Sequence, residues 1–147
     1  MPIRCEIVSK DRLVYEGDVD IVVAPGVDGE MGILPRHAPL LTTLKPGVLK
    51  VRRGGDEEIF AVAGGVMEVR PDIVTVLADA AEHADEIDVA RAEEARRRAE
   101  ESLRTGPPPG SDAFMAAEMA LRRSNLRLQV AQRRRRTPRI ESSGSGD

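Results

Sequence analysis

The sequence predicts an α+β fold, an N-terminal antiparallel β-sandwich followed by a C-terminal two-helix antiparallel hairpin. In the first 86 residues, apolar side chains alternate with polar ones at the period-two spacing of half-buried strands. After residue 87 they recur at helical spacing, with one break at a glycine- and proline-rich turn. We therefore expect a sandwich domain at 1–86, a helical domain at 87–136 and a disordered tail at 137–147.

Short apolar runs separated by turn residues make up the first half. Ile3, Cys5 and Ile7 alternate with polar neighbours, and Gly54-Gly55 suits a tight hairpin turn. Short strands with turns every 8–12 residues or so are typical of an antiparallel sandwich or barrel. The other runs expected to form strands lie at 13–15, 19–23, 48–53, 59–63, 66–70 and 73–78.

Two glycine- or proline-rich stretches interrupt this pattern. Three prolines divide residues 29–51, and because proline cannot donate to a strand ladder, we expect Pro35, Pro39 and Pro46 to separate short extended pieces. The Gly64-Gly65 pair is not followed by the helix and lysine of a phosphate-binding loop. We interpret that pair as a β-bulge or a close backbone approach.

Two helices are expected in the second half. Asp88 can cap a helix from Val89 to about Arg104, which the segment 105–110, TGPPPG, terminates. Ser111 or Asp112 then caps a second helix over 113–135, and so short a turn makes the two helices antiparallel. Their facing sides are rich in alanine, which buries little area, so the hairpin is a candidate moving part.

The composition argues against an enzyme. Cys5 is the single cysteine, so an internal disulfide and a thiolate zinc cluster are excluded. His37 and His83 are the two histidines, and no nucleophile adjoins His37 in the sequence. Glu30 and Glu68 form no more than the carboxylate pair that any acidic surface offers. No secretory signal or membrane-spanning run is present in the sequence, so we expect a soluble protein or a peripheral part of something larger.

Charge is distributed unevenly along the chain. Residues 1–86 carry a net charge of −7, and residues 87–147 carry +4. Four consecutive arginines at 133–136, near the end of the second helix, predict a nucleic-acid partner, an acidic protein partner or simply a solvated helix end. Phe114 is the one aromatic residue of that helix, and single strands usually require stacking aromatics, so an acidic protein is favoured. A free-standing adaptor that binds nucleic acid or an acidic protein is the alternative function.

Two pairs of residues could bind an anion. Asp88 and Arg91 lie three apart at a helix N-terminus, whose free N–H groups favour phosphate. Arg123 and Arg127 lie four apart on one face of the second helix. The alternative is a solvated helix face with a local Asp–Arg pair.

Residues 29–51 (GEMGILPRHAPLLTTLKPGVLKV) and 60–88 (FAVAGGVMEVRPDIVTVLADAAEHADEID) strongly resemble the epsilon subunit of bacterial F-type ATP synthase. The resemblance implies a sandwich of about ten strands, a helical hairpin and no catalysis of its own. It also implies a place in the rotor, which couples ion translocation to ATP synthesis at the cytoplasmic face of the bacterial plasma membrane. The partners implied are the gamma subunit near His37 and the c-ring near Glu30.

The helices of that family move between a folded hairpin and an extended form, which reaches between the alpha and beta subunits and blocks ATP hydrolysis. Basic residues of the second helix then meet an acidic segment of the beta subunit. By this resemblance the donors are Arg122, Arg123, Arg127, Arg133, Arg134, Arg135 and Arg136.

Some bacterial members bind ATP in the folded hairpin through the motif Ile/Leu-Asp-x-x-Arg-Ala, which residues 87–92 match in full. ATP is then a regulatory ligand, and no cofactor is required. Ala116 stands where strong binders have a basic residue, which predicts weak affinity. The residues implied in ATP binding are Glu82, Ile87, Asp88, Arg91, Ala92, Arg123 and Arg127.

Overall fold

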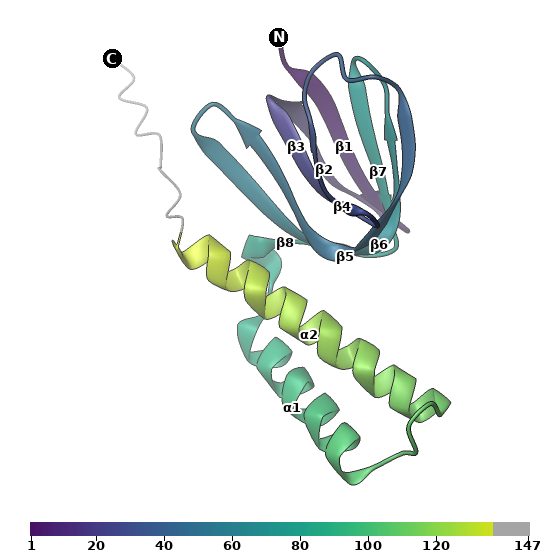
Figure 1. Cartoon of the computed structure of the whole chain (residues 1–147). Coiled ribbons are helices and arrows are strands. Elements are labelled where there is room, and N and C mark those ends of the chain that lie inside the picture. The colour runs from purple at the N-terminus through teal and green to yellow at the C-terminus, as the bar shows by residue number, and fades with distance from the viewer. Residues whose placement is uncertain (137–147) are drawn as a thin grey trace, which may run out of the picture.

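A computed structural model describes residues 1–136 of the chain, and side chains as far as Arg133. The tail expected at 137–147 lies outside the described residues. A strand-rich part and a helical hairpin lie one above the other, as Figure 1 shows. The elements are β1 (Ile3–Ser9), β2 (Arg12–Val19), β3 (Ile21–Gly26), β4 (Gly29–Ile33), β5 (Leu40–Arg53), β6 (Asp56–Val69), β7 (Ile73–Ala78), β8 (Ala81–His83), the 3₁₀ turn η1 (Ala84–Glu86), α1 (Val89–Thr105) and α2 (Asp112–Arg136).

The predicted α+β architecture is confirmed. The strands follow the order β2-β1-β7-β6-β5-β3-β4, and β8 pairs with β6. Every described pair is antiparallel except β1 with β7, which runs parallel from Arg4↔Ile73 to Val8↔Leu77. Eight strands are described where the family resemblance implied about ten, since β5 and β6 each continue for 14 residues and pair from Leu40↔Val69 to Arg53↔Asp56.

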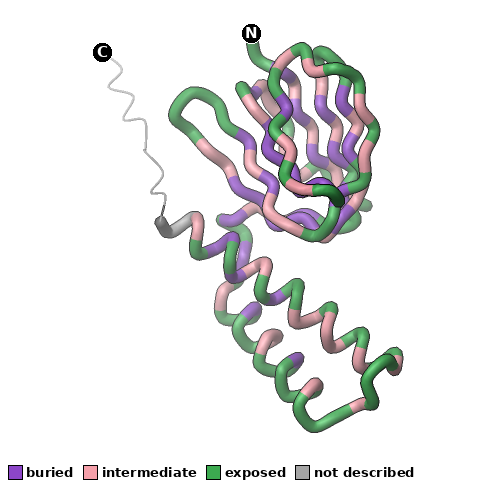
Figure 2. The backbone as a smooth tube through the Cα atoms, in the orientation of Figure 1, coloured by how far each residue is buried: buried purple, intermediate pink, exposed green. Residues whose placement is uncertain are grey.

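A β-branched and aliphatic core fills the strand-rich part, and Figure 2 shows the buried positions repeating along its strands. The alternation read from the sequence holds for β1, where Ile3, Cys5 and Ile7 are fully buried. Phe60 lies at the centre and meets Tyr15 edge-to-face at 5.6 Å between ring centroids. Burial raises the pKa of Cys5 to about 12, because a thiolate there would lose its hydration.

The Gly64-Gly65 pair is a close backbone approach, as predicted. Both residues have positive φ, 104° and 141°. A Cβ atom on Gly65 would lie 2.2 Å from the carbonyl oxygen of Leu77 on the paired strand β7. Only glycine fits this position without a shift of the backbone.

The expectation for Pro46 was wrong. Pro35 and Pro39 lie in the connection between β4 and β5, but Pro46 lies inside β5. The ladder between β3 and β5 is interrupted at this point, between the pairs Val23↔Lys50 and Gly26↔Leu44. The missing N–H of Pro46 therefore costs little, because the irregular register leaves no ladder bond for it there.

Both helices begin at the predicted caps. The Asp88 carboxylate accepts a hydrogen bond from the backbone N–H of Arg91 at 3.1 Å, and the Ser111 hydroxyl accepts one from the N–H of Phe114 at 3.2 Å. The helices pack together through small residues, and the Ser124 hydroxyl donates to the Ala120 carbonyl of its own helix. The buried residues of this seam are Ala92, Ala99, Ser124 and Leu128.

The Gly65→Ala substitution tests the close approach. We expect it to lower the free energy of unfolding by more than about 2 kcal/mol, since strain at a positive φ adds to the clash with Leu77. Gly55→Ala is the matched control, because a Cβ there meets nothing within 4 Å and its φ is not positive. Urea denaturation of both variants measures the difference, and equal midpoints would contradict the account.

Candidate functional site

The hairpin meets the sheet at the C-terminal half of α2. Val130 is fully buried there against Ile59 and Ala61 of β6 and against Ile87, the residue just before the Asp88 cap. We call this set the docking cluster; its buried members are Ile59, Ala61, Ala84, Ile87, Val130 and Ala131. Half of them are alanines, so the cluster buries far less apolar area than the core of the sheet.

An ion pair lies beside the docking cluster. The Arg127 guanidinium donates to both carboxylate oxygens of Glu82 on β8, at 2.8 and 3.0 Å. The two side chains are 30% and 27% exposed, so the pair is partly shielded from water. The hydrogen bond to Glu82 raises the pKa of Arg127, and the negative charge of Asp88 adds to this effect. The bidentate geometry fixes α2 on β8.

A small cavity of about 310 Å³ opens at this ion pair. Three arginines line it, Arg12 at the start of β2 and Arg123 and Arg127 on α2. Two carboxylates, Glu82 and Glu86, complete its charged lining, and the remainder is small and apolar: Ala61, Ala63, Ala80, Ala81 and Leu126. The site can bind an anion, because Arg12 can release Glu86, Arg127 can release Glu82, and a guanidinium binds phosphate oxygens in their place.

Sequence reasoning missed Arg12 and Glu86. The Arg12 guanidinium donates to Glu86 at 2.9 Å, across a separation of 74 residues in the chain. This hydrogen bond lowers the pKa of Glu86. Neither residue belongs to a local motif, so no signal in the sequence could have joined them.

The motif at 87–92 lies next to this cavity without lining it. Ile87 belongs to the docking cluster, and Ala92 is fully buried in the helix seam. Asp88 caps α1, and the described contact between Asp88 and Arg91 uses the backbone N–H of Arg91, whose side chain is exposed. The structure thus brings together Glu82, Arg123 and Arg127. Asp88 is close enough for its negative charge to raise the pKa of Arg127.

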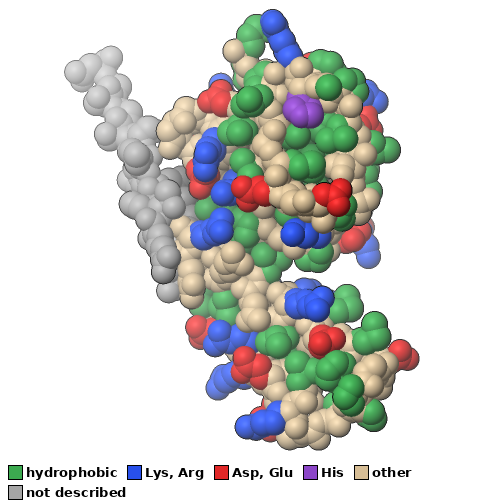
Figure 3. Space-filling model, viewed as in Figure 1, with side chains coloured by type: hydrophobic (Ala, Val, Ile, Leu, Met, Phe, Trp, Pro, Cys, Tyr) green, Lys and Arg blue, Asp and Glu red, His purple; other side chains and the backbone are tan. Residues whose placement is uncertain are grey.

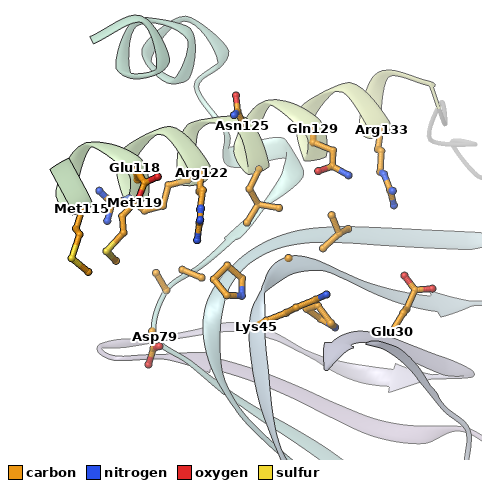
Figure 4. Close-up of a pocket in the computed structure, with 18 residues that line it drawn as sticks. Glu30, Lys45, Asp79, Met115, Glu118, Met119, Arg122, Asn125, Gln129 and Arg133 are labelled. Carbon is orange, nitrogen blue, oxygen red and sulfur yellow. The ribbon is translucent and has the colours of Figure 1, made fainter. Parts of the chain in front are cut away.

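A wider groove of about 1220 Å³ lies between α2 and residues of β3, β4, β5 and β6. Figure 3 shows the hollow between the two parts, and Figure 4 shows Arg122 and Arg133 pointing from α2 toward the strands. Lys45 and Glu30 lie on the opposite wall (Figure 4). Of the basic residues expected to meet an acidic partner, Arg122, Arg123 and Arg133 line this groove. Arg134, Arg135 and Arg136 belong to α2, but their side chains lie outside the described residues.

Glu30 and His37 occupy different kinds of backbone. Glu30 is exposed on β4, opposite Pro25. His37 lies in the connection between β4 and β5, where its Nδ1 can donate a hydrogen bond to the carbonyl oxygen of Ala38 at 2.8 Å. Arg36, with φ of 63°, donates its N–H to the Pro71 carbonyl at 3.0 Å and fixes this connection against the turn between β6 and β7.

Three large apolar side chains are exposed on neighbouring strands. Leu41 on β5, Val66 on β6 and Leu77 on β7 are 70%, 39% and 56% exposed. Val66 is directly opposite Leu77, and Leu41 is opposite Glu68, two residues along β6 from Val66. We call these three residues the outer apolar patch. Apolar residues clustered on an open sheet face mark an interaction surface.

The described residues, 1–136, contain no group of three or more His, Cys, Asp or Glu side chains placed to hold a metal ion. No helix within the same range is both long and apolar enough to span a bilayer.

Two family models match consecutive parts of the chain. Residues 2–84 match the β-sandwich domain of the ATP synthase delta/epsilon chain, and residues 85–132 match its long α-helix domain. The chain belongs to the ATP synthase delta/epsilon chain family. The resemblance seen in the sequence is thereby confirmed.

Similar proteins carry the same description. A curated protein of Dehalococcoides mccartyi named ATP synthase epsilon chain is 51% identical to this chain, over 94% of this chain and 98% of that protein. A protein of the same name from Herpetosiphon aurantiacus is 52% identical, over 92% of this chain and 98% of that protein. Among solved structures, a chain of the mitochondrial ATP synthase of Euglena gracilis (OSCP/F1/c-ring) shares the fold at a TM-score of 0.75 and 24% identity, over 89% of this chain and 81% of that one.

A double-mutant cycle tests the ion pair between β8 and α2. We expect Glu82→Gln and Arg127→Gln to lower the thermal stability of the docked hairpin, with a coupling free energy of about 0.5–1 kcal/mol between them, as for partly exposed pairs. Amide hydrogen exchange in α2 reports the docking. Glu94→Gln with Arg98→Gln, an exposed pair within α1, is the control cycle. A coupling at Glu82–Arg127 no larger than in the control would show that the pair does not hold the hairpin.

Proposed function

We propose that the protein is a central-stalk subunit of a bacterial F-type ATP synthase, which couples ion translocation to ATP synthesis and inhibits ATP hydrolysis through its helices. The observation that carries this proposal is the match of both family domains across residues 2–132, together with relatives about half identical over nearly the whole chain. The alternative of a free-standing nucleic-acid adaptor receives no support from these relatives. Within the complex the subunit is non-catalytic and lies at the cytoplasmic face of the plasma membrane, without entering it.

The sheet is the part that we assign to the rotor. The outer apolar patch of Leu41, Val66 and Leu77 requires a partner surface to leave water. Its first residue, Leu41, is the second residue of β5, directly after the connection that carries His37, so a gamma subunit could cover both. Glu30, exposed on β4, is the residue that we assign to the c-ring.

The helices are the part that we assign to regulation. The small docking cluster and the partly exposed Glu82–Arg127 pair hold α2 to the sheet weakly enough for the hairpin to be released. A released α2 could extend between the alpha and beta subunits. Its arginines would then leave their partners within the chain and bind an acidic segment of the beta subunit. This contact would block rotation in the direction of ATP hydrolysis.

ATP is the ligand that we assign to the folded state. Arg123 and Arg127 share a cavity with Glu82, and Asp88 lies close enough to influence Arg127. A bound triphosphate would hold α2 against β8 and so oppose the extended, inhibitory form, because a ligand that binds one state preferentially shifts the population toward it. No other cofactor is required.

Reconstitution tests the inhibitory function. Adding the full chain to an F-type ATPase depleted of its epsilon subunit should lower ATP hydrolysis. A chain that lacks residues 87–147 should bind without inhibiting, since the helices are removed. A chain that lacks only 137–147 is the matched control and should inhibit, because it keeps α2. Equal hydrolysis with and without the full chain would refute the inhibitory function.

Calorimetric titration of the isolated protein tests ATP binding. We expect binding at high micromolar to millimolar ATP, and we expect Arg123→Ala to weaken it about tenfold through loss of a charge-assisted hydrogen bond. Arg122→Ala is the matched control. It removes one positive charge from the residue next to Arg123 on α2, and Arg122 is not one of the described residues that line the cavity. Absence of heat at millimolar ATP would rule out the sensing role.

A further inference from the structure

The cavity at the junction is built by both parts of the molecule. Arg123 and Arg127 come from the hairpin, while Arg12 comes from the first residue of β2, in the sheet. Arg12 faces the cavity while donating to Glu86 at 2.9 Å, and it reaches the Ala81 carbonyl of β8 at 3.5 Å. It therefore carries a positive charge to the wall opposite α2.

The two ion pairs of the cavity differ in exposure. The Arg12 and Glu86 side chains are 52% and 47% exposed, whereas Arg127 and Glu82 are 30% and 27% exposed. Water and dissolved ions compete strongly for the partners of an exposed ion pair, so Glu86 is easily displaced from Arg12. A polyphosphate carries several charged oxygens and fits the planar fork of a guanidinium, so it competes well with one carboxylate.

We propose that Arg12 is a phosphate-binding residue of the ATP site, a role that rests on the ATP sensing proposed above. The phosphate chain takes Arg12 from Glu86 on one wall of the cavity and engages Arg123 and Arg127 on the other. The exchange forms and breaks only hydrogen bonds and ion pairs.

This arrangement explains how a small ligand could hold the two parts together. A nucleotide bound only by α1 and α2 would stabilise the hairpin itself, but not its attachment to the sheet. Contact with Arg12 makes the ligand a bridge between β2 and α2. The population of docked hairpin then rises with ATP concentration, since only the docked state presents all three guanidinium groups.

A purely structural role for Arg12 makes a different prediction. If Arg12 served only to fix η1 through Glu86, then removing either partner would have the same effect on ATP binding. If Arg12 binds phosphate, the two substitutions have opposite effects: Arg12→Ala removes a ligand contact, whereas Glu86→Gln frees Arg12 from a competing carboxylate.

Calorimetric titration of the full chain with ATP separates these roles. We expect Arg12→Ala to weaken ATP binding about tenfold and Glu86→Gln to tighten it a few-fold. Arg4→Ala is the matched control and should leave binding unchanged, because Arg4 is an ion-paired arginine of β1 that does not line the cavity. Arg12→Gln replaces Arg12→Ala if the alanine variant unfolds at a lower urea concentration than Arg4→Ala.

Three results would overturn the proposal. Equal weakening by Arg12→Ala and Glu86→Gln would show that Arg12 acts only through Glu86. Wild-type affinity in both Arg12 variants would show that the nucleotide does not reach Arg12, although ATP sensing would stand. No binding by the wild-type chain would remove ATP sensing and this inference with it.

Discussion

Arg127 on α2 and Glu82 on β8 join the two parts of this protein, and the position of the hairpin depends on that pair and on the small docking cluster beside it. The geometry makes the attachment specific, since both oxygens of one carboxylate accept from one guanidinium. Its strength is limited by the alanines around it and by partial exposure to water. Specific but weak attachment is what a reversible regulatory element requires.

The sheet is built in the opposite way. Phe60, Ile3, Leu49 and Met67 are fully buried in one continuous core, and the long ladder between β5 and β6 links its ends. Opening this core would expose far more apolar area than undocking α2. This energetic contrast separates the molecule into two parts. The sheet keeps its shape when it meets a partner, and the helical hairpin can detach from the sheet.

Local patterns predicted what local physics determines. The alternation of apolar and polar residues predicted β1, and the Asp88 cap predicted the start of α1. The Gly64-Gly65 pair predicted a close backbone approach, which the structure shows between Gly65 and Leu77. Pro46 was misjudged because its tolerance depends on a register break with β3, which no neighbouring residue reveals. The parallel pairing of β1 with β7 and the contact from Arg12 to Glu86 join residues about 70 positions apart. The motif at 87–92 and the basic residues assigned to ATP were predicted by resemblance. The contribution of Arg12 on β2 to the cavity could be found only in the fold.

The docking contact also lies near one end of a long helix. α2 has 25 residues, yet its docked residues fall at 126–131, which leaves about 27 Å of helix between Val130 and Asp112 at 1.5 Å per residue. Any tilt of α2 would therefore pivot close to its C-terminal end. A tilt of about 10° at the pivot would carry the far tip through about 5 Å, by the same helix length. Sub-ångström adjustments around Arg127 would thus become displacements the size of a side chain at the hairpin turn.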